Sequence, residues 1–191
     1  MYFESFPTTI WNNKTVVDIS RRAAVLQKVK GDPYAFVPYT VVEGDTIEMI
    51  AYHYYGDAKL SWLVMLANDI IDPYCDFFKE SGPLDTFIIN KYRDQAQTAL
   101  NNPNLTSQQV LQWTQAGDTN ENIIFYFSKY NEDIQVGRKT QESPKFAAGE
   151  FLPMRYYDYE IQENEKKRTI KLISDIYVRQ IIDEMKTILN D

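Results

Sequence analysis

The sequence has little of what the commonest sites require. Its 191 residues include one cysteine, Cys75, and one histidine, His53. One cysteine excludes an internal disulfide, and a single residue of each kind is too few for a zinc site built from these ligands. A lone cysteine also fits a protein made in a reducing cytoplasm. We therefore expect no metal and no cofactor.

Long apolar runs and long basic runs are missing as well. No run approaches the roughly 18 apolar residues that span a bilayer, and the first eleven residues lack the features of a signal peptide. No basic run is longer than Lys166–Arg168, and the net charge is −7. These absences argue against a membrane protein and against a nucleic-acid-binding protein.

Motifs for catalysis are also lacking. The sequence contains no glycine-rich phosphate-binding loop. His53 has no candidate base or nucleophile at helical spacing, so a hydrolytic triad is not indicated. Asp69, Asp72 and Asp76 could hold Ca²⁺ or act as paired carboxylates, but capping a helix and shaping the next turn is the simpler interpretation. We predict no catalytic residue and no enzyme.

Aromatic side chains are abundant instead. Fourteen tyrosines accompany ten phenylalanines and three tryptophans, and 44% of the residues are hydrophobic. The composition is that of a globular protein long enough to bury a core. A tyrosine ring is apolar with a polar tip, so tyrosines suit protein interfaces and sugar sites. For most of these rings, filling the core is the simpler interpretation.

Residues 1–38 read as an extended arm broken by prolines, with a short strand at Thr15–Ile19 and a short helix at Ser20–Lys30. A strand at Tyr39–Val42 then leads through a turn into a helix that ends at Gly56. A second helix begins near Ala58. The expected turn residues are Gly44, Asp45 and Thr46. The expected core residues are Ile47, Ile50, Ala51, Tyr54, Trp62 and Leu66.

The pattern after residue 83 predicts a helix at Leu84–Leu100 that completes a segment of residues 39–100. Residues 101–153 are expected to be a loop-rich connector with one buried strand at 123–127. In the last segment, 154–191, alternation predicts a β-hairpin of Arg155–Gln162 and Arg168–Ile173. The final helix, Asp175–Leu189, carries an apolar stripe. The stripe comprises Val178, Ile181, Ile182, Met185, Ile188 and Leu189.

The stretch from Tyr39 to Ile47, with Ile50-Ala51, Tyr54–Asp57 and a later Asn68, resembles the LysM module. The resemblance implies a βααβ fold of the kind that often binds N-acetylglucosamine polymers. The usual Pro-Gly-Gln ending is absent after Asn68, so the closing strand must come from elsewhere, and 123–127 is one candidate. The expected fold is α+β: a LysM-like βαα core, an extended N-terminal arm and a C-terminal β-hairpin plus helix.

A narrower resemblance covers scattered parts of nearly the whole chain. Residues 54–73, Phe87 through Tyr92, the start at Tyr2-Phe3 and the segment 163–173 are similar to the LysM-containing baseplate wedge proteins of T4-like contractile-tailed bacteriophages. This implies a non-enzymatic virion protein, assembled in the host cytoplasm, that joins neighbouring wedges. The implied partners are other wedge proteins and the central hub or tail tube, with multiple copies in a six-fold baseplate and neither nucleic acid nor membrane.

The alternative hypothesis is a LysM-type peptidoglycan-binding module of a tail-associated cell-wall protein. For the wedge protein, the arm and the C-terminal segment are the expected contacts, because tyrosines and long apolar stripes suit interfaces. The candidate interface residues are Tyr2, Phe3, Phe6, Tyr156, Tyr157, Tyr159, Tyr177, Ile181, Met185 and Ile188.

Overall fold

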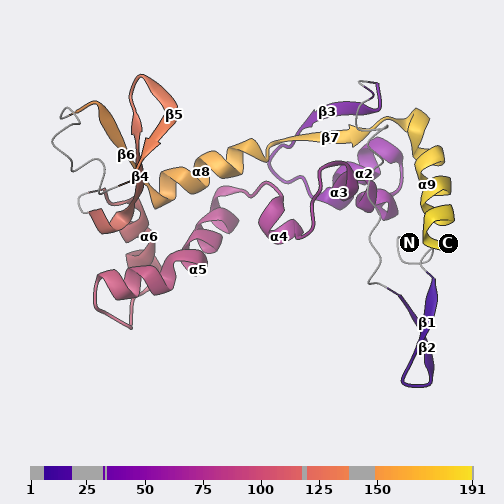
Figure 1. The fold of residues 1–191 in the computed structure, drawn as a ribbon, viewed down its shortest axis with the longest axis horizontal. Helices are drawn as coiled ribbons and strands as arrows, with labels where there is room; N and C mark the ends of the chain where they lie inside the picture. The colour runs from indigo at the N-terminus through magenta and orange to yellow at the C-terminus, as the bar shows by residue number, and fades with distance from the viewer. Residues whose placement is uncertain (1–6, 19–31, 33, 118–119, 138–148, 191) are drawn as a thin grey trace. The chain divides into compact units, whose positions relative to one another are not determined.

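The computed structural model describes residues 7–18, 32, 34–117, 120–137 and 149–190. Helices and strands are mixed along the chain, which confirms the α+β class (Figure 1). The chain forms two compact units. We call Met1–Phe78 with Lys167–Asp191 the split unit, and Lys79–Lys166 the inserted unit.

The split unit is built around a two-stranded antiparallel sheet whose strands come from distant parts of the chain. Strand β3 (Phe36–Thr40) pairs with β7 (Thr169–Ile173), from Phe36 opposite Ile173 to Thr40 opposite Thr169. Between them in sequence lie α2 (Ile47–Tyr55), the short helix η2 (Ala58–Leu60) and α3 (Ser61–Ala67). The closing strand is therefore β7, and the suggestion that 123–127 closes this sheet is wrong.

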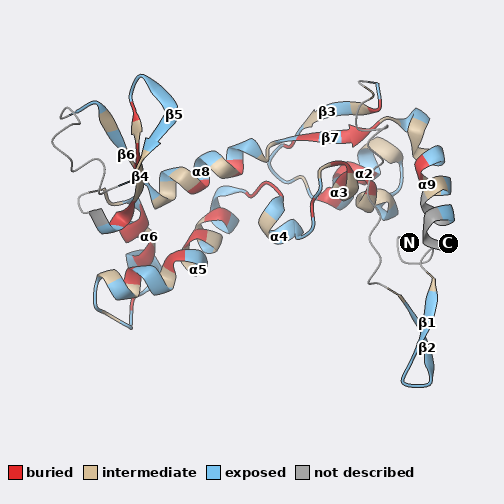
Figure 2. Ribbon diagram, viewed as in Figure 1, coloured by how far each residue is buried: buried red, intermediate tan, exposed pale blue. Residues whose placement is uncertain are grey.

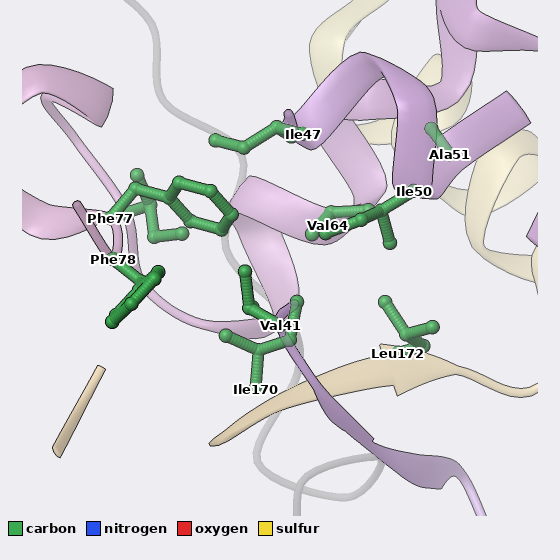
Figure 3. Close-up of a cluster of buried hydrophobic side chains, with 10 residues drawn as sticks. Val41, Ile47, Ile50, Ala51, Val64, Phe77, Phe78, Ile170 and Leu172 are labelled. Atoms are coloured by element: carbon green, nitrogen blue, oxygen red, sulfur yellow. The ribbon is translucent and has the colours of Figure 1, made fainter. Parts of the chain in front are cut away.

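Helix α2 begins and ends where local chemistry requires. The Thr46 side chain accepts a hydrogen bond from the backbone N–H of Met49 and caps the first turn. Gly56 ends the helix with φ of 76°, a conformation that costs glycine little. The helix buries one face against the sheet (Figure 3). The buried cluster is Val41, Ile47, Ile50, Ala51, Val64, Ile70, Phe77, Phe78, Ile170 and Leu172.

Helix α3 buries a face slightly different from the expected one. Leu63, Val64 and Ala67 are buried, whereas Trp62 and Leu66 are half-buried, as is Tyr54 of α2. Trp62 and Leu66 pack at the margin of a second cluster, formed by Leu63, Ala67, Ile173 and Ile181. The sequence pattern located the helix and the buried Leu63, but Trp62 and Leu66 lie at the margin of the core and not inside it.

The acidic residues after α3 shape a turn, as the simpler interpretation held. Asp72 caps the short helix α4 (Pro73–Asp76) by accepting from the N–H of Tyr74. Asp76 accepts from the N–H groups of Ile71 and Asp72. Asp69 has φ of 54° at the start of this turn.

Residues 8–17 of the N-terminal arm form a β-hairpin. Strand β1 (Thr8–Trp11) pairs with β2 (Lys14–Val17) around Asn12 and Asn13, whose φ values are 50° and 57°. Two positive φ values make a turn whose twist suits adjacent antiparallel strands. The expected strand at Thr15–Ile19 overlaps β2. The expected helix at Ser20–Lys30 lies outside the described residues.

The inserted unit combines helices with a three-stranded antiparallel sheet. Helices α5 (Ser81–Ala99) and α6 (Ser107–Gln115) pack together, and the sheet has the order β5-β4-β6. Its strands are β4 (Ile123–Ser128), β5 (Asn131–Val136) and β6 (Phe151–Arg155), with the short helix η3 (Asn120–Asn122) before β4. The buried residues around α5 and α6 are Leu84, Ile88, Tyr92, Ala96, Leu105, Val110 and Trp113.

This unit confirms the predicted helix after residue 83 and the predicted strand at 123–127. The loop-rich interpretation of 101–153 is wrong, because this segment also contains α6, β5 and β6. Thr106 and Gln109 form a capping box that begins α6.

The predicted hairpin in 154–191 is also wrong. Residues Tyr156–Lys166 form helix α8, and residues Thr169–Ile173 pair with β3 instead. The buried positions of α8 are Glu160 and Asn164, one helical turn apart. Because these inward positions are polar, the apolar residues of α8 do not recur at helical spacing. Apolar and polar residues alternate instead, which is typical of a strand.

The final helix, α9 (Asp175–Asn190), is present as predicted. Its residue Ile181 is buried against Leu63, Ala67 and Ile173, and Tyr177 and Val178 pack beside it. The first half of α9 thus belongs to the core of the split unit, as its partly red colouring indicates (Figure 2).

If β7 completes the core of the split unit, Leu172→Ala should lower the free energy of unfolding by about 2–5 kcal/mol, because the side chain is fully buried. The control is Lys171→Ala, whose side chain is exposed and whose backbone contacts are retained. Urea denaturation followed by circular dichroism measures both. Equal midpoints for Leu172→Ala and the wild type would contradict this packing.

Candidate interaction surfaces

The Gly-Asp-Thr turn that precedes α2 is a compact hydrogen-bonded unit. The Asp45 carboxylate accepts from the Tyr39 hydroxyl at 2.8 Å and from the N–H of Val42 at 3.0 Å. Gly44 has φ of 89°, and Thr46 caps the helix. Burial and the bond to Asp45 raise the pKa of Tyr39, which therefore stays a neutral donor. The three predicted turn residues thus fix the entry to α2.

The side-chain amide of Asn68 joins α3 to the closing strand. Its Nδ2 donates to the carbonyls of Val64 and Lys171, each at 2.8 Å. Its Oδ1 accepts from the N–H of Lys171, also at 2.8 Å. The amide therefore pairs with both backbone groups of one β7 residue, as a neighbouring strand would. The Tyr55 hydroxyl accepts from the N–H of Ile173 beside it.

A second asparagine makes the same kind of pair in the inserted unit. Asn164 Oδ1 accepts from the N–H of Lys79 at 2.9 Å, and its Nδ2 donates to the Lys79 carbonyl at 2.8 Å. Both residues are buried. Because these residues are the first of the unit and one near its end, the bonds hold the two ends of the inserted unit together.

The basic run at 166–168 has structural contacts and is not a hairpin turn. Lys166 forms an ion pair with Glu163 inside α8. In the split unit, Lys167 donates to the carbonyl of Cys75, and the Arg168 guanidinium lies 4.1 Å from the centre of the Phe78 ring.

The tyrosines of α8 face groups of their own unit. Tyr156 stacks on Trp113 with ring centres 5.2 Å apart, Tyr157 donates to Asp85, and Tyr159 meets Phe125 edge to face. All three rings are half-buried. These contacts support the helix packing of the inserted unit. That the exposed parts of the three rings contact a partner protein stays a prediction.

A buried carboxylate anchors the same helix. Glu160 accepts from the Tyr92 hydroxyl at 2.5 Å and from Lys91 at 2.7 Å. Burial and the bond to this carboxylate raise the pKa of Tyr92 well above its usual range, so its hydroxyl remains a donor. Pairing with a cation and a hydroxyl explains how a glutamate occupies the inward face of α8.

The predicted interface residues of α9 are only partly described. The Tyr177 hydroxyl donates to Asp32 at 2.8 Å, and Ile181 is buried in the core. Side-chain positions of Met185 and Ile188 lie outside those the structure describes, as do residues Tyr2, Phe3 and Phe6. These last five residues stay predictions.

One group of exposed apolar residues in the described part of the chain was not selected by the sequence analysis. In the hairpin β1–β2, every strand residue is exposed, with Ile10 at 78% and Trp11 at 71% of full exposure (Figure 2). Val16 and Val17 add to it. The adjacent asparagines Asn12 and Asn13 between two β-prone runs were the available signal for this hairpin.

Within the described ranges, no group of three or more histidine, cysteine or acidic side chains is placed to hold a metal ion. His53 is exposed on α2. In that same part of the chain, no helix combines the length and apolar character needed to cross a membrane.

Comparison with known proteins identifies the class of this protein. It is a structural protein of a phage tail baseplate. The family described as "Base plate wedge protein 53" matches residues 8–188, and the chain belongs to this family. It is therefore a virion protein, located in the tail baseplate, where it interacts with other baseplate components.

Individual relatives differ in how much they share. The chain is 23% identical over 156 residues to Baseplate wedge protein gp53 of Enterobacteria phage T4, covering 82% of this chain and 74% of that protein. It is 53% identical over 38 residues to Esterase MT1326 and Esterase Rv1288 of two Mycobacterium tuberculosis strains. That segment is 20% of this chain and spans only 8% of each esterase.

The Asp32–Tyr177 bond makes the docking of α9 sensitive to acid. The N–H of Tyr34 and the Tyr177 hydroxyl bind the Asp32 carboxylate and hold the pKa of Asp32 below its ordinary 3.8. A lowered pKa stabilises the fold above that ordinary value, and the effect is lost as pH falls through the folded-state pKa. Tyr177→Phe should therefore speed hydrogen exchange in α9 at pH 7 more than at pH 3.

The matched control is Tyr130→Phe, which removes a hydroxyl from an exposed ring in the other unit. Mass-spectrometric hydrogen exchange, corrected for the intrinsic rate at each pH, provides the comparison. If Tyr177→Phe and Tyr130→Phe leave α9 equally protected at pH 7, Asp32 does not hold this helix.

Proposed function

We propose that the chain joins neighbouring wedges around the central hub or tail tube, in multiple copies of a six-fold baseplate assembled in the host cytoplasm. The observation that carries the proposal is the division into two units, each with its own buried core. The chain passes between them twice, after Phe78 and after Lys166. A protein with two separately packed bodies can bind a different subunit with each.

We propose that its role is structural and that it catalyses no reaction. Membership of a family of baseplate proteins supports this. The short match to two esterases covers too little of either to carry their activity over.

We also propose that β3, α2, α3 and β7 form a LysM-type βααβ unit with the inserted unit placed before its last strand. The antiparallel pairing of β3 with β7 and the role of Asn68 support this interpretation. It keeps the alternative function open, because a LysM-type fold could bind peptidoglycan.

Reconstitution tests the joining role. Wedges prepared without this chain should stay separate when mixed with the hub, and adding the purified chain should produce six-fold baseplates visible by electron microscopy. Six-fold rings that form equally well without the chain would contradict the proposal.

A pull-down on insoluble peptidoglycan distinguishes the alternative. The purified chain should remain in the supernatant. Retention on peptidoglycan, together with baseplates that form without the chain, would favour the cell-wall-binding function.

A further inference from the structure

The hairpin β1–β2 lacks the packing that such an element needs. In the part of the chain that the structure describes, its strands pair only with each other, and all eight strand residues are exposed. A two-stranded hairpin alone is at best marginally stable in water. Four of its eight strand residues are large and apolar: Ile10, Trp11, Val16 and Val17. Because successive side chains point to opposite faces, Ile10 and Val17 lie on one face and Trp11 and Val16 on the other. The hairpin therefore needs further strands or a packing partner to be stable.

No strand among the described residues pairs with the outer edges of the hairpin. The N–H of Asp18 donates to the carbonyl of Pro7 just beyond the paired residues. Hydrogen-bonded and non-hydrogen-bonded pairs alternate in an antiparallel ladder. The register therefore turns the backbone groups of Thr8 and Ile10 outward on β1, and those of Thr15 and Val17 outward on β2.

Most of the other described strand edges are closed to such pairing. Strand β3 contains Pro38 and β6 contains Pro153, and each proline removes a donor. The free edge of β7 is covered, because Asn68 bonds to Lys171 and Tyr55 bonds to Ile173. Strand β5 differs: it has no proline, it pairs only with β4 within the described ranges, and its residues are mostly exposed.

The exposed side chains of β5 complement those of the hairpin. Strand β5 carries Glu132 and Asp133 and an Ile134 that is 51% exposed. Strand β2 begins with Lys14, the only charged residue in the two hairpin strands. Opposite charges and apolar residues on adjacent strands stabilise pairing.

We propose that the hairpin of one copy of this chain adds through β2 to the β5 edge of a second copy, extending its three-stranded sheet to five strands. The contact is head to tail, since each copy offers its hairpin and receives another. Such contacts close into rings when the rotation between copies permits. The inference rests on the proposed joining role for its place in a six-fold baseplate, but the pairing itself is a property of the purified chain.

Charge reversal tests the pairing in solution. Four-residue strands bury little area, so the weight-average mass in sedimentation equilibrium should rise with concentration towards about 1 mM. Lys14→Glu should weaken association about tenfold by replacing an attraction with a repulsion. The double variant Glu132→Lys, Asp133→Lys should do the same, and combining all three changes should restore association.

The control is Lys59→Glu, the same charge change at an exposed residue of η2. It should leave association unchanged. A chain that stays monomeric at every concentration, or one whose association is the same in all these variants, overturns the proposal. Wedge joining can still depend on the chain in that case, so the two failures are distinguishable.

Cross-linking identifies the edges that meet. In a Cys75→Ser background, Thr15→Cys chains are mixed with longer-tagged Ile134→Cys chains and oxidised. We place Thr15 opposite Ile134 on antiparallel strands, a register in which Lys14 is diagonal to Asp133 on the same face. Directly opposite residues on paired strands lie about 4.5–5.5 Å apart, within reach of a disulfide. The mixed dimer should exceed that formed with Gln95→Cys, an exposed position on α5. Equal yields from the Ile134→Cys and Gln95→Cys chains would overturn the pairing of copies.

Discussion

The fold depends on two asparagine side chains that bind the backbone as a strand would. Asn68 pairs with both backbone groups of Lys171, 103 residues further along the chain, and Asn164 pairs with both groups of Lys79 across 85 residues. The bonds between Asn164 and Lys79 are buried, and leaving buried groups without partners costs about 1–3 kcal/mol each. The bonds between Asn68 and Lys171 are exposed, and each such bond contributes about 0.5–1.5 kcal/mol. The two amides therefore select the one arrangement in which distant segments meet.

The bonds between Asn164 and Lys79 make the bonds between Asn68 and Lys171 easier to form. Once the inserted unit folds, the bonds between Asn164 and Lys79 bring its two ends together. Closing a long loop is entropically costly, and a folded insertion with adjacent ends shortens the effective loop. Strand β7 begins three residues after the inserted unit ends. Its first residues are therefore held near Phe78, the last residue of the split unit before the insertion. A baseplate component can in this way carry two bodies without weakening either core.

Local signals made part of this structure predictable from sequence. The cap at Thr46, the glycine at 56 and the apolar period of α5 are short-range features, and the helices they predict are present. The strand at Arg168–Ile173 was predicted, but its pairing with β3 was not, because pairing across a long insertion leaves no local pattern. Helix α8 was missed because Glu160 and Asn164 fill its inward face. Three tyrosines of α8 were predicted to form an interface because tyrosines suit interfaces. Their side chains instead contact Trp113, Asp85 and Phe125 of the same unit.

The stability of Asn68→Ala tests this account most directly. Hydrogen exchange at the Lys171 amide and the free energy of unfolding are measured together, with Asn90→Ala, an exposed position on α5, as reference. We expect Asn68→Ala to expose the Lys171 N–H to exchange and to lower the free energy of unfolding by about 1–3 kcal/mol. A Lys171 amide as protected as in the wild type, with an unchanged free energy of unfolding, would show that β7 is held without this amide and would contradict the account.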